Sequence, residues 1–248
     1  MLALSRGRYG ARFAESAEDL QAAQALRWQA FLARQGAGSG SDSDPFDTRC
    51  RHLLVEERAT GRLVCCLRIL PLADGSAIGE TYSAQFYDLS ALQGYPGRMA
   101  EMGRFCIAAE CRDPEILRTA WGALARYVEA EGIEMLFGCS SFVGTDWEQY
   151  TDAFVLLAQN HLAPRRWYPR IKAPQVVRYA RALIGRTGDP RLAMQRMPPL
   201  LRSYLAMGGW VSDHAVVDRD LDTLHVFTGL EVRAIPEARV RALRLAAG

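Results

Sequence analysis

The alternation of apolar and polar residues along the chain predicts its secondary structure. Tyr9–Phe13 has the two-residue period of a strand, and residues 16–33 place apolar side chains at helical spacing behind Ser16, a typical N-cap. Two apolar runs, 52–56 and 63–70, are separated by turn residues and indicate a β-hairpin. The first part of the chain is therefore expected to form a strand, a helix and a hairpin.

The middle of the chain continues this alternation. Residues 99–108 form an apolar run typical of a buried strand, and a helix is expected over 113–131 because Pro114 suits a first helical turn. A strand is expected at 135–139 and a helix at 146–161. The order of these elements predicts a mixed α/β fold.

The last third of the chain has a weaker pattern. A short helix is expected at 198–207, followed by closing strands at 209–217 and 224–232. The 248 residues, 49% of them hydrophobic, suffice for one sizeable core. We therefore expect one domain rather than a string of small ones.

Charge and cysteine content narrow the class of protein. The chain has 30 basic and 28 acidic residues, a net charge of +2, which gives no electrostatic reason to expect nucleic acid as a partner. Six cysteines include no C-x-x-C pair, so no metal site is expected, and their apolar surroundings indicate reduced thiols in the cytoplasm. Neither a signal segment nor a run of about 20 apolar residues occurs, so any membrane contact is expected to be peripheral, at the inner membrane surface.

The segment Glu101-Met-Gly-Arg104 gives the strongest chemical signal. It places a carboxylate beside a buried strand, where a charge costs free energy unless it is paired or used. Glu101 is a candidate general base for taking a proton from an amine. It is also a candidate structural partner of Arg104, or a ligand for a substrate's ammonium group. These interpretations stay open from residue type alone.

Five further residues are candidates for substrate binding. Arg68 ends an apolar strand and could bind a carboxylate through paired hydrogen bonds, or could be an edge arginine with only a packing role. Asp44 and Asp47 lie in a loop and could select a cation, or could simply be solvated. Arg27 and Phe31 share one face of the first helix, where core packing is the simpler interpretation for Phe31.

The segment Cys139-Ser140-Ser141-Phe142 follows the end of an expected strand. Its amides and hydroxyls, those of Ser140 first, could polarise a substrate carbonyl, with Ser141 and Phe142 contributing to substrate binding. A covalent acyl-enzyme is not expected, because no histidine forms a recognisable pair with Cys139 or the serines. Plain core packing is the alternative interpretation for Phe142.

The order of these motifs resembles the L-ornithine N-alpha-acyltransferases of ornithine lipid synthesis. The resemblance runs from about Tyr9 to about Arg233 and extends more faintly to the acyl-homoserine-lactone synthases, which have a similar Glu-x-x-Arg on the corresponding strand. The motifs are Arg27-Trp28 with Phe31, Asp44-Pro-Phe-Asp47, Arg68, Glu80-Thr-Tyr-Ser83, Glu101-Met-Gly-Arg104 and the run from Phe137 to Asp146.

This resemblance implies a fold, a reaction and a set of roles. The fold is a GNAT-like mixed central sheet flanked by helices, with residues 1–161 as the acyltransferase core and 162–248 as a C-terminal extension that completes the same domain. The reaction is direct transfer of a (3-hydroxy)acyl chain from acyl carrier protein to the α-amine of L-ornithine. No cofactor is implied beyond the phosphopantetheine that arrives on the carrier. Asp44 and Asp47 match an Asp-x-x-Asp of the family's amino-acid pocket.

Two local features bear on the acyl donor. GNAT enzymes that use coenzyme A place a glycine-rich turn before the helix that follows the central strand, and its amides bind the pyrophosphate. Here the junction 108–113 has no glycine and contains two acidic residues, which favours a carrier protein over free coenzyme A. The basic and aromatic segment 165–172 suits an acidic carrier protein or anionic lipid headgroups, with a solvated loop as the alternative.

Three other functions stay open. They are the same transfer to glutamine, an acyl-homoserine-lactone synthase, and a non-catalytic carrier-protein or membrane-binding module. The C-terminal extension is long for such a synthase. The presence of Glu101, Arg104 and Arg68 together with both loop aspartates argues against a module that has lost its chemistry.

Overall fold

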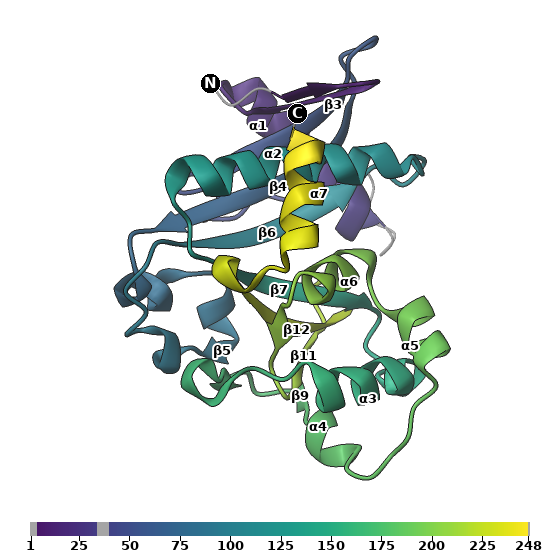
Figure 1. The fold of residues 1–248 in the computed structure, drawn as a ribbon. Helices are drawn as coiled ribbons and strands as arrows, with labels where there is room; N and C mark the ends of the chain where they lie inside the picture. The colour runs from purple at the N-terminus through teal and green to yellow at the C-terminus, as the bar shows by residue number, and fades with distance from the viewer. Residues whose placement is uncertain (1–3, 34–39, 248) are drawn as a thin grey trace. The chain divides into compact units, whose positions relative to one another are not determined.

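The computed structural model describes residues 4–33 and 40–247, which form two units (Figure 1). The first unit comprises the described parts of Met1–Pro71 and Glu237–Gly248 together with Met102–Ile133. The second unit comprises Leu72–Glu101 and Glu134–Pro236. Each unit is therefore assembled from segments far apart in the sequence.

The sheet of the first unit has the strand order β1-β2-β3-β4-β6. Its strands from β1 to β4 pair antiparallel, each with the next. Alternate side chains of β2 are buried, as its two-residue period requires. The bounds are β1 Leu4–Arg6, β2 Tyr9–Phe13, β3 Arg51–Glu57, β4 Leu63–Leu72 and β6 Met99–Ile107.

Helices α1, α2 and α7 belong to the first unit, with bounds Ala17–Phe31, Pro114–Glu131 and Glu237–Ala247. Helix α1 begins where Ser16 accepts a hydrogen bond from the Asp19 amide at 3.2 Å, and it buries Ala23 and Leu26 in a core cluster. Helix α2 ends at Gly132, whose φ of 61° is left-handed, as expected for a glycine at this position. Helix α7 lies beside α2.

The second unit contains the order β7-β12-β11-β9, with β10 also paired to β12. Strand β12 pairs antiparallel with β7 along its whole length, from Thr223 opposite Val143 to Glu231 opposite Met135. A separate antiparallel pair is formed by β5 and β8. The bounds are β5 Tyr87–Asp88, β7 Met135–Val143, β8 Arg170–Ile171, β9 Val176–Val177, β10 Trp210–Val211, β11 Ala215–Asp218 and β12 Thr223–Glu231.

Helices of the second unit pack on its sheet around a core that includes Phe142, Phe154 and Tyr179. Helices α4 and α5 both contact α3. The bounds are α3 Thr151–Asn160, α4 Tyr179–Ala182, α5 Pro190–Arg196 and α6 Pro199–Ala206, and the short 3₁₀ turns η2, η3, η4 and η6 span Gly75–Glu80, Ser83–Gln85, Ser90–Leu92 and Arg165–Trp167.

The structure confirms the order of the expected elements and corrects some of their bounds. The strand expected at 135–139 continues to Val143, because it pairs with β12 over nine residues. The helix expected from residue 146 begins at Thr151, after a 3₁₀ turn. The strand expected at 209–217 is two strands, β10 and β11. The boundary proposed between residues 161 and 162 stays a prediction.

Candidate active site

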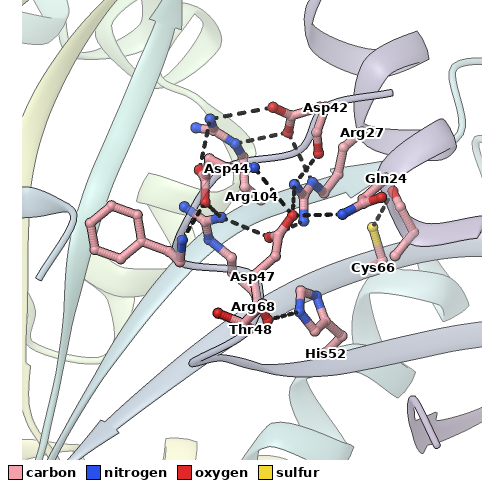
Figure 2. Close-up of polar contacts among 12 residues, drawn as sticks. Gln24, Arg27, Asp42, Asp44, Asp47, Thr48, His52, Cys66, Arg68 and Arg104 are labelled. Carbon is pink, nitrogen blue, oxygen red and sulfur yellow. Dashed lines mark hydrogen bonds and ion pairs between the residues drawn. The ribbon is translucent and has the colours of Figure 1, made fainter. Parts of the chain in front are cut away.

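Three arginines and three aspartates form a buried network in the first unit, here called the Arg/Asp cluster (Figure 2). Its members come from α1, from the loop before β3, and from β4 and β6; they are Arg27, Asp42, Asp44, Asp47, Arg68 and Arg104. The formal charges of the six side chains cancel. A cluster of this kind tolerates burial only because each charge has opposite partners.

Arg27 lies at the centre of the Arg/Asp cluster and is 1% exposed. Its Nε donates to Asp42 Oδ2 at 2.9 Å, and its two terminal nitrogens donate to the two Asp47 oxygens at 2.8 and 3.0 Å. Gln24, one helical turn before Arg27, donates to Asp47 Oδ2 at 2.9 Å. The Asp47 carboxylate is therefore held by a bidentate contact with the Arg27 guanidinium and by a hydrogen bond from the Gln24 amide, a strong and directional arrangement.

The other two arginines complete the Arg/Asp cluster. Arg68 donates to Asp44 Oδ1 at 2.6 Å and to Asp47 Oδ1 at 2.9 Å. Arg104 donates to Asp42 Oδ2 at 2.9 Å. The Asp44 side chain is 18% exposed against 3% for Asp47, so Asp44 is the more accessible of the two aspartates that the sequence singles out.

Burial alone would raise the pKa of Asp47, but the hydrogen bonds from Arg27 and Gln24 outweigh it and hold the pKa well below its usual range. The pKa of Asp44 is lowered in the same way, against burial, by Arg68 and Arg104. Burial lowers the pKa of His52, whose Nε2 lies 3.0 Å from the Asp47 carbonyl oxygen. Asp44 and Asp47 are therefore ionised at neutral pH, and His52 is uncharged.

Arg104 has an unusual backbone for a strand residue, with a φ of 53°. A side chain other than glycine rarely adopts this left-handed region, and holding it there costs about 1–3 kcal/mol. The surrounding contacts must offset that cost, and the ion pair with Asp42 is one of them. With this backbone conformation, the Arg104 side chain reaches Asp42 in the Arg/Asp cluster.

Glu101 belongs to the second unit and is 5% exposed. Its Oε2 accepts a hydrogen bond from the Tyr82 amide at 2.9 Å. Its Oε1 accepts one from the Ser83 amide at 2.7 Å and one from the Ser83 hydroxyl at 2.6 Å. These donors lie at the start of η3, so the carboxylate is fixed in orientation by a turn of the chain, as catalysis by a general base requires.

A thiol lies next to the Glu101 and Ser83 pair. The Cys139 sulfur is 3.4 Å from the Ser83 hydroxyl oxygen and half-buried. Ser83 itself is fully buried. Glu101, Ser83 and Cys139 are therefore linked through one hydroxyl, although they lie on β6, η3 and β7.

The serines after Cys139 do not lie at a strand end, as the sequence analysis expected. Ser140 and Ser141 are inside β7, opposite Val226 and His225 of β12. The Ser140 hydroxyl is buried and accepts a hydrogen bond from Thr228 at 2.9 Å. The strand end expected before Cys139 is thus wrong, because β7 continues to Val143, and the role of Ser140 as an oxyanion partner stays a prediction.

Two aromatic candidates take structural positions. Phe142 is buried and packs against Tyr150 and Phe154, with ring centroids 4.9 and 5.0 Å away. Phe31 packs at the edge of the α1 core cluster. Both positions agree with the core interpretation that the sequence left open. Ser141 is exposed, and its proposed contribution to substrate binding stays a prediction.

Several residues of these two sites were missed by the sequence analysis. Asp42 is a member of the Arg/Asp cluster, and Gln24 donates a hydrogen bond to the cluster. The Tyr82 and Ser83 amides donate to Glu101. The motif Glu80-Thr-Tyr-Ser83 was noticed, but the role of its last residue depends on a contact 18 residues away in sequence. The signal available in the sequence for Asp42 was its spacing, two residues before Asp44.

Comparisons with known proteins identify the class of the fold. Residues 26–122 match the acetyltransferase (GNAT) domain family. FeeM, an N-acyl amino acid synthase from uncultured soil microbes, superimposes with a TM-score of 0.52 at 12% identity, covering 92% of this chain and 94% of that one. TofI in its apo form superimposes with a TM-score of 0.51 at 12% identity, covering 97% and 99%. The protein is an acyltransferase with the expected GNAT-like fold, a mixed sheet flanked by helices.

Sequence relatives define the family. The L-ornithine N(alpha)-acyltransferase of Rhodobacter capsulatus is 33% identical over 243 residues, covering 92% of each chain. That of Rhizobium meliloti is 30% identical over 238 residues, covering 90% of this chain and 80% of the other. The chain belongs to the L-ornithine N(alpha)-acyltransferase family.

Over residues 4–33 and 40–247, no group of three or more His, Cys, Asp or Glu side chains is placed to hold a metal ion. In the same part of the chain, no helix combines the length and the apolar character needed to cross a bilayer.

Proposed function

We propose that this protein transfers a (3-hydroxy)acyl chain from acyl carrier protein to the α-amine of L-ornithine, forming lyso-ornithine lipid. The observation that supports it most is the buried, oriented carboxylate of Glu101 in a chain of this family. The acceptor follows from the relatives, which are named for ornithine.

Glu101 takes the role of general base in this proposal. An α-amine arrives protonated, and it must lose a proton to attack a thioester. The carboxylate takes that proton, directly or through one water molecule. The amine nitrogen then forms a bond to the thioester carbon. As the carbon–sulfur bond breaks, the proton that the nitrogen loses passes to the departing phosphopantetheine thiolate, so the products are the amide and the free thiol. Cys139 is not needed as a nucleophile in this direct transfer.

The start of α2 supports a carrier protein as donor. The first amides of a helix can bind a phosphate, as a pyrophosphate of coenzyme A would require. In this chain the Asp113 carboxylate already accepts from the Glu115 amide at 2.9 Å, and Glu115 adds a second acidic group in the first turn. Both carboxylates repel an anion there. Phosphopantetheine attached to a protein has no pyrophosphate to place.

The Arg/Asp cluster supports a refined version of the acceptor site. Asp47 is saturated by Arg27, Arg68 and Gln24, which suits a structural role. Asp44 is more exposed, and we assign to it the contact with the side-chain ammonium of ornithine. Arg68 keeps its proposed contact with the substrate carboxylate, although Asp44 and Asp47 compete for its guanidinium.

The segment 165–172 is proposed to face the acidic carrier protein. Its basic residues Arg165, Arg170 and Lys172 are all exposed. Arg165 and Arg170, with Ala91 and Tyr168, line an open surface cavity of about 430 Å³. A concave basic surface is complementary to an acidic protein and speeds the encounter with it.

A thioester-release assay tests this proposal against its alternatives. Acyl carrier protein and coenzyme A thioesters with the same acyl chain are supplied with ornithine, glutamine or S-adenosylmethionine. We expect release with the carrier thioester and ornithine. Faster release with glutamine or with S-adenosylmethionine would indicate one of the other enzymes, comparable kcat/KM with coenzyme A would remove the carrier protein, and no release at all would support a non-catalytic module.

A further inference from the structure

The modest net charge of the chain conceals a strong asymmetry. Residues 165–202 contain ten basic residues and one acidic residue, Asp189, a net charge of +9. The rest of the chain contains 20 basic and 27 acidic residues, a net charge of −7. A basic surface is therefore present in the second unit, and the total of +2 gives no sign of it.

The most exposed part of this basic run is residues 178–196, here called the α4–α5 segment, which contains five arginines and the single Asp189. All five arginines are exposed. Asp189 offsets only one of these five charges, and its carboxylate caps α5 by accepting from the amides of Arg191 and Leu192. Within the described part of the chain, none of the five arginines forms an ion pair, in contrast to those of the Arg/Asp cluster.

Apolar side chains are interleaved with these arginines. Ile184, in the turn after α4, is 79% exposed, Met194 is 45% exposed and Leu192 is 37% exposed. Among the described residues, six large apolar side chains are exposed, and these three fall within 19 residues. Figure 1 shows the connection from α4 to α5 as a loop, and hydrogen bonds from Gln159 to the Arg186 carbonyl and from the Asp189 amide to Asp152 fix this loop on α3.

We propose that the α4–α5 segment binds the surface of an anionic phospholipid bilayer. The five arginines, which form no ion pair among the described residues, are opposite in charge to the headgroups, and Ile184 inserts among the acyl chains. Apolar side chains interleaved with arginines are typical of segments that lie on an anionic bilayer surface, and an acidic protein partner is the alternative that the test below distinguishes. The amphiphilic product of the proposed reaction gives this surface a use, because lyso-ornithine lipid leaves the enzyme into a bilayer. The membrane surface itself rests on charge and exposure, not on the identity of the substrate.

Vesicle sedimentation tests the proposal without any substrate. We expect the protein to bind phosphatidylcholine vesicles that contain phosphatidylglycerol, to ignore phosphatidylcholine alone, and to lose binding as salt is raised. The variant Arg181→Gln/Arg186→Gln/Arg191→Gln should bind roughly a hundredfold more weakly, at about fivefold for each basic residue near an anionic surface. Ile184→Ser should weaken binding about tenfold by removing buried apolar area.

A matched control removes the same charge elsewhere. Arg112→Gln/Arg118→Gln/Arg239→Gln replaces three arginines that are also exposed, all in the first unit. Its vesicle binding should stay within about threefold of wild type, and all variants should melt like wild type. The proposal is overturned if wild type does not bind anionic vesicles or if the control loses as much as the α4–α5 variant. It is also overturned if the α4–α5 variant keeps vesicle binding and instead loses kcat/KM for the acylated carrier. An enzyme that fails to acylate ornithine but binds vesicles as described leaves this proposal standing and removes only the proposed function.

Discussion

The two charged sites of this protein are built in opposite ways. In the Arg/Asp cluster, three cations and three anions share hydrogen bonds, and the charge of every member is compensated inside the first unit. Glu101 in the second unit is instead held by two backbone amides and a hydroxyl. A compensated network is mainly a structural device, since removing one charge leaves another buried without its partner. The hydrogen bonds to Glu101 fix the orientation that its proposed role as general base needs.

The largest effect is expected at Glu101. Glu101→Gln should lower kcat by 10²–10⁴-fold, the usual loss when a general base is removed. The amide can still accept from Ser83, and the loss of the Tyr82 bond should cost only about 1–3 kcal/mol of folding free energy. Steady-state kinetics and thermal melting measure the two effects. A well-folded variant with more than about a tenth of wild-type kcat would make Glu101 a structural residue.

The complementary change is Asp47→Asn in the Arg/Asp cluster. It leaves the buried Arg27 with a neutral amide in place of its partner, and breaking a buried ion pair costs about 3–5 kcal/mol. The melting temperature should fall by roughly 6–20 °C, with KM for ornithine little changed at a temperature where the variant is folded. A normal melting curve together with a raised KM for ornithine would instead return Asp47 to the substrate pocket.

The dependence of stability on pH has two windows. Burial lowers the pKa of His225 to about 4, from 6.5 when unfolded, so the unfolded chain binds more protons between these values. Stability should therefore fall as pH drops from 6.5 to 4, by about 3 kcal/mol in total. The lowered pKa values of Asp44 and Asp47 act below about pH 4, where their protonation removes the stability of the Arg/Asp cluster.

Urea unfolding at several pH values tests both windows. His225→Gln should reduce the loss between pH 6.5 and 4 and leave the loss below pH 4 in place. A part of the loss above pH 4 should remain, because burial also lowers the pKa values of His52 and His161. If His225→Gln retains the full wild-type dependence, the histidine is not the group responsible. His225 lies 3.1 Å from the Tyr87 hydroxyl, so Tyr87→Phe serves as a control that changes this contact but removes no group titrating below pH 8.

A smaller effect is expected at Asp44. Asp44→Asn should raise KM for ornithine roughly tenfold and leave KM for a neutral acceptor such as glutamine unchanged, because a partly exposed charge pair is worth less than a fully desolvated one. Asp47→Asn is the matched comparison, with the same chemical change three residues away. Equal effects of Asp44→Asn on both acceptors would mean that its carboxylate does not contact the ammonium group.

The smallest effect is expected at Ser83. Ser83→Ala removes the hydroxyl that donates to Glu101 at 2.6 Å and leaves the amide bond of the same residue in place. We expect kcat to fall about tenfold with KM unchanged, since a hydrogen bond to a charged group contributes about 1.5–3 kcal/mol and part of the orientation remains. Ser83→Thr, which keeps a hydroxyl, should recover most of the activity. A Thr variant as slow as the Ala variant would assign the loss to packing.

The sequence predicted the fold better than it predicted the sites. Local signals such as the Ser16 cap and Pro114 placed α1 and α2 correctly, because they act within one turn of the chain. The strand β7 was predicted four residues too short, because its length is set by pairing with β12, some 80 residues later. Pairing partners at that distance leave no local pattern.

The same distinction explains the sites. Glu101, Arg104, Arg68 and the two loop aspartates were chosen by residue type and by the family resemblance. The ion pairs between the arginines and the aspartates of the Arg/Asp cluster depend on contacts such as that of Arg68 with Asp47, 21 residues apart. The contact of Glu101 with Ser83 had no signal in spacing, because it depends on how η3 folds back. The basic run at 165–202 was readable from sequence, but the total charge obscured it.

The most direct test of the account is the identity of the product in a single competition. Wild-type enzyme receives 3-hydroxyacyl carrier protein and the matching coenzyme A thioester, labelled differently in their acyl chains, together with equal concentrations of L-ornithine and L-glutamine. Mass spectrometry should find α-N-acylornithine with the acyl chain of the carrier protein as the dominant product, and Glu101→Gln should abolish most of it. Dominant acylglutamine, or a product that takes its acyl chain equally from coenzyme A, would contradict the account.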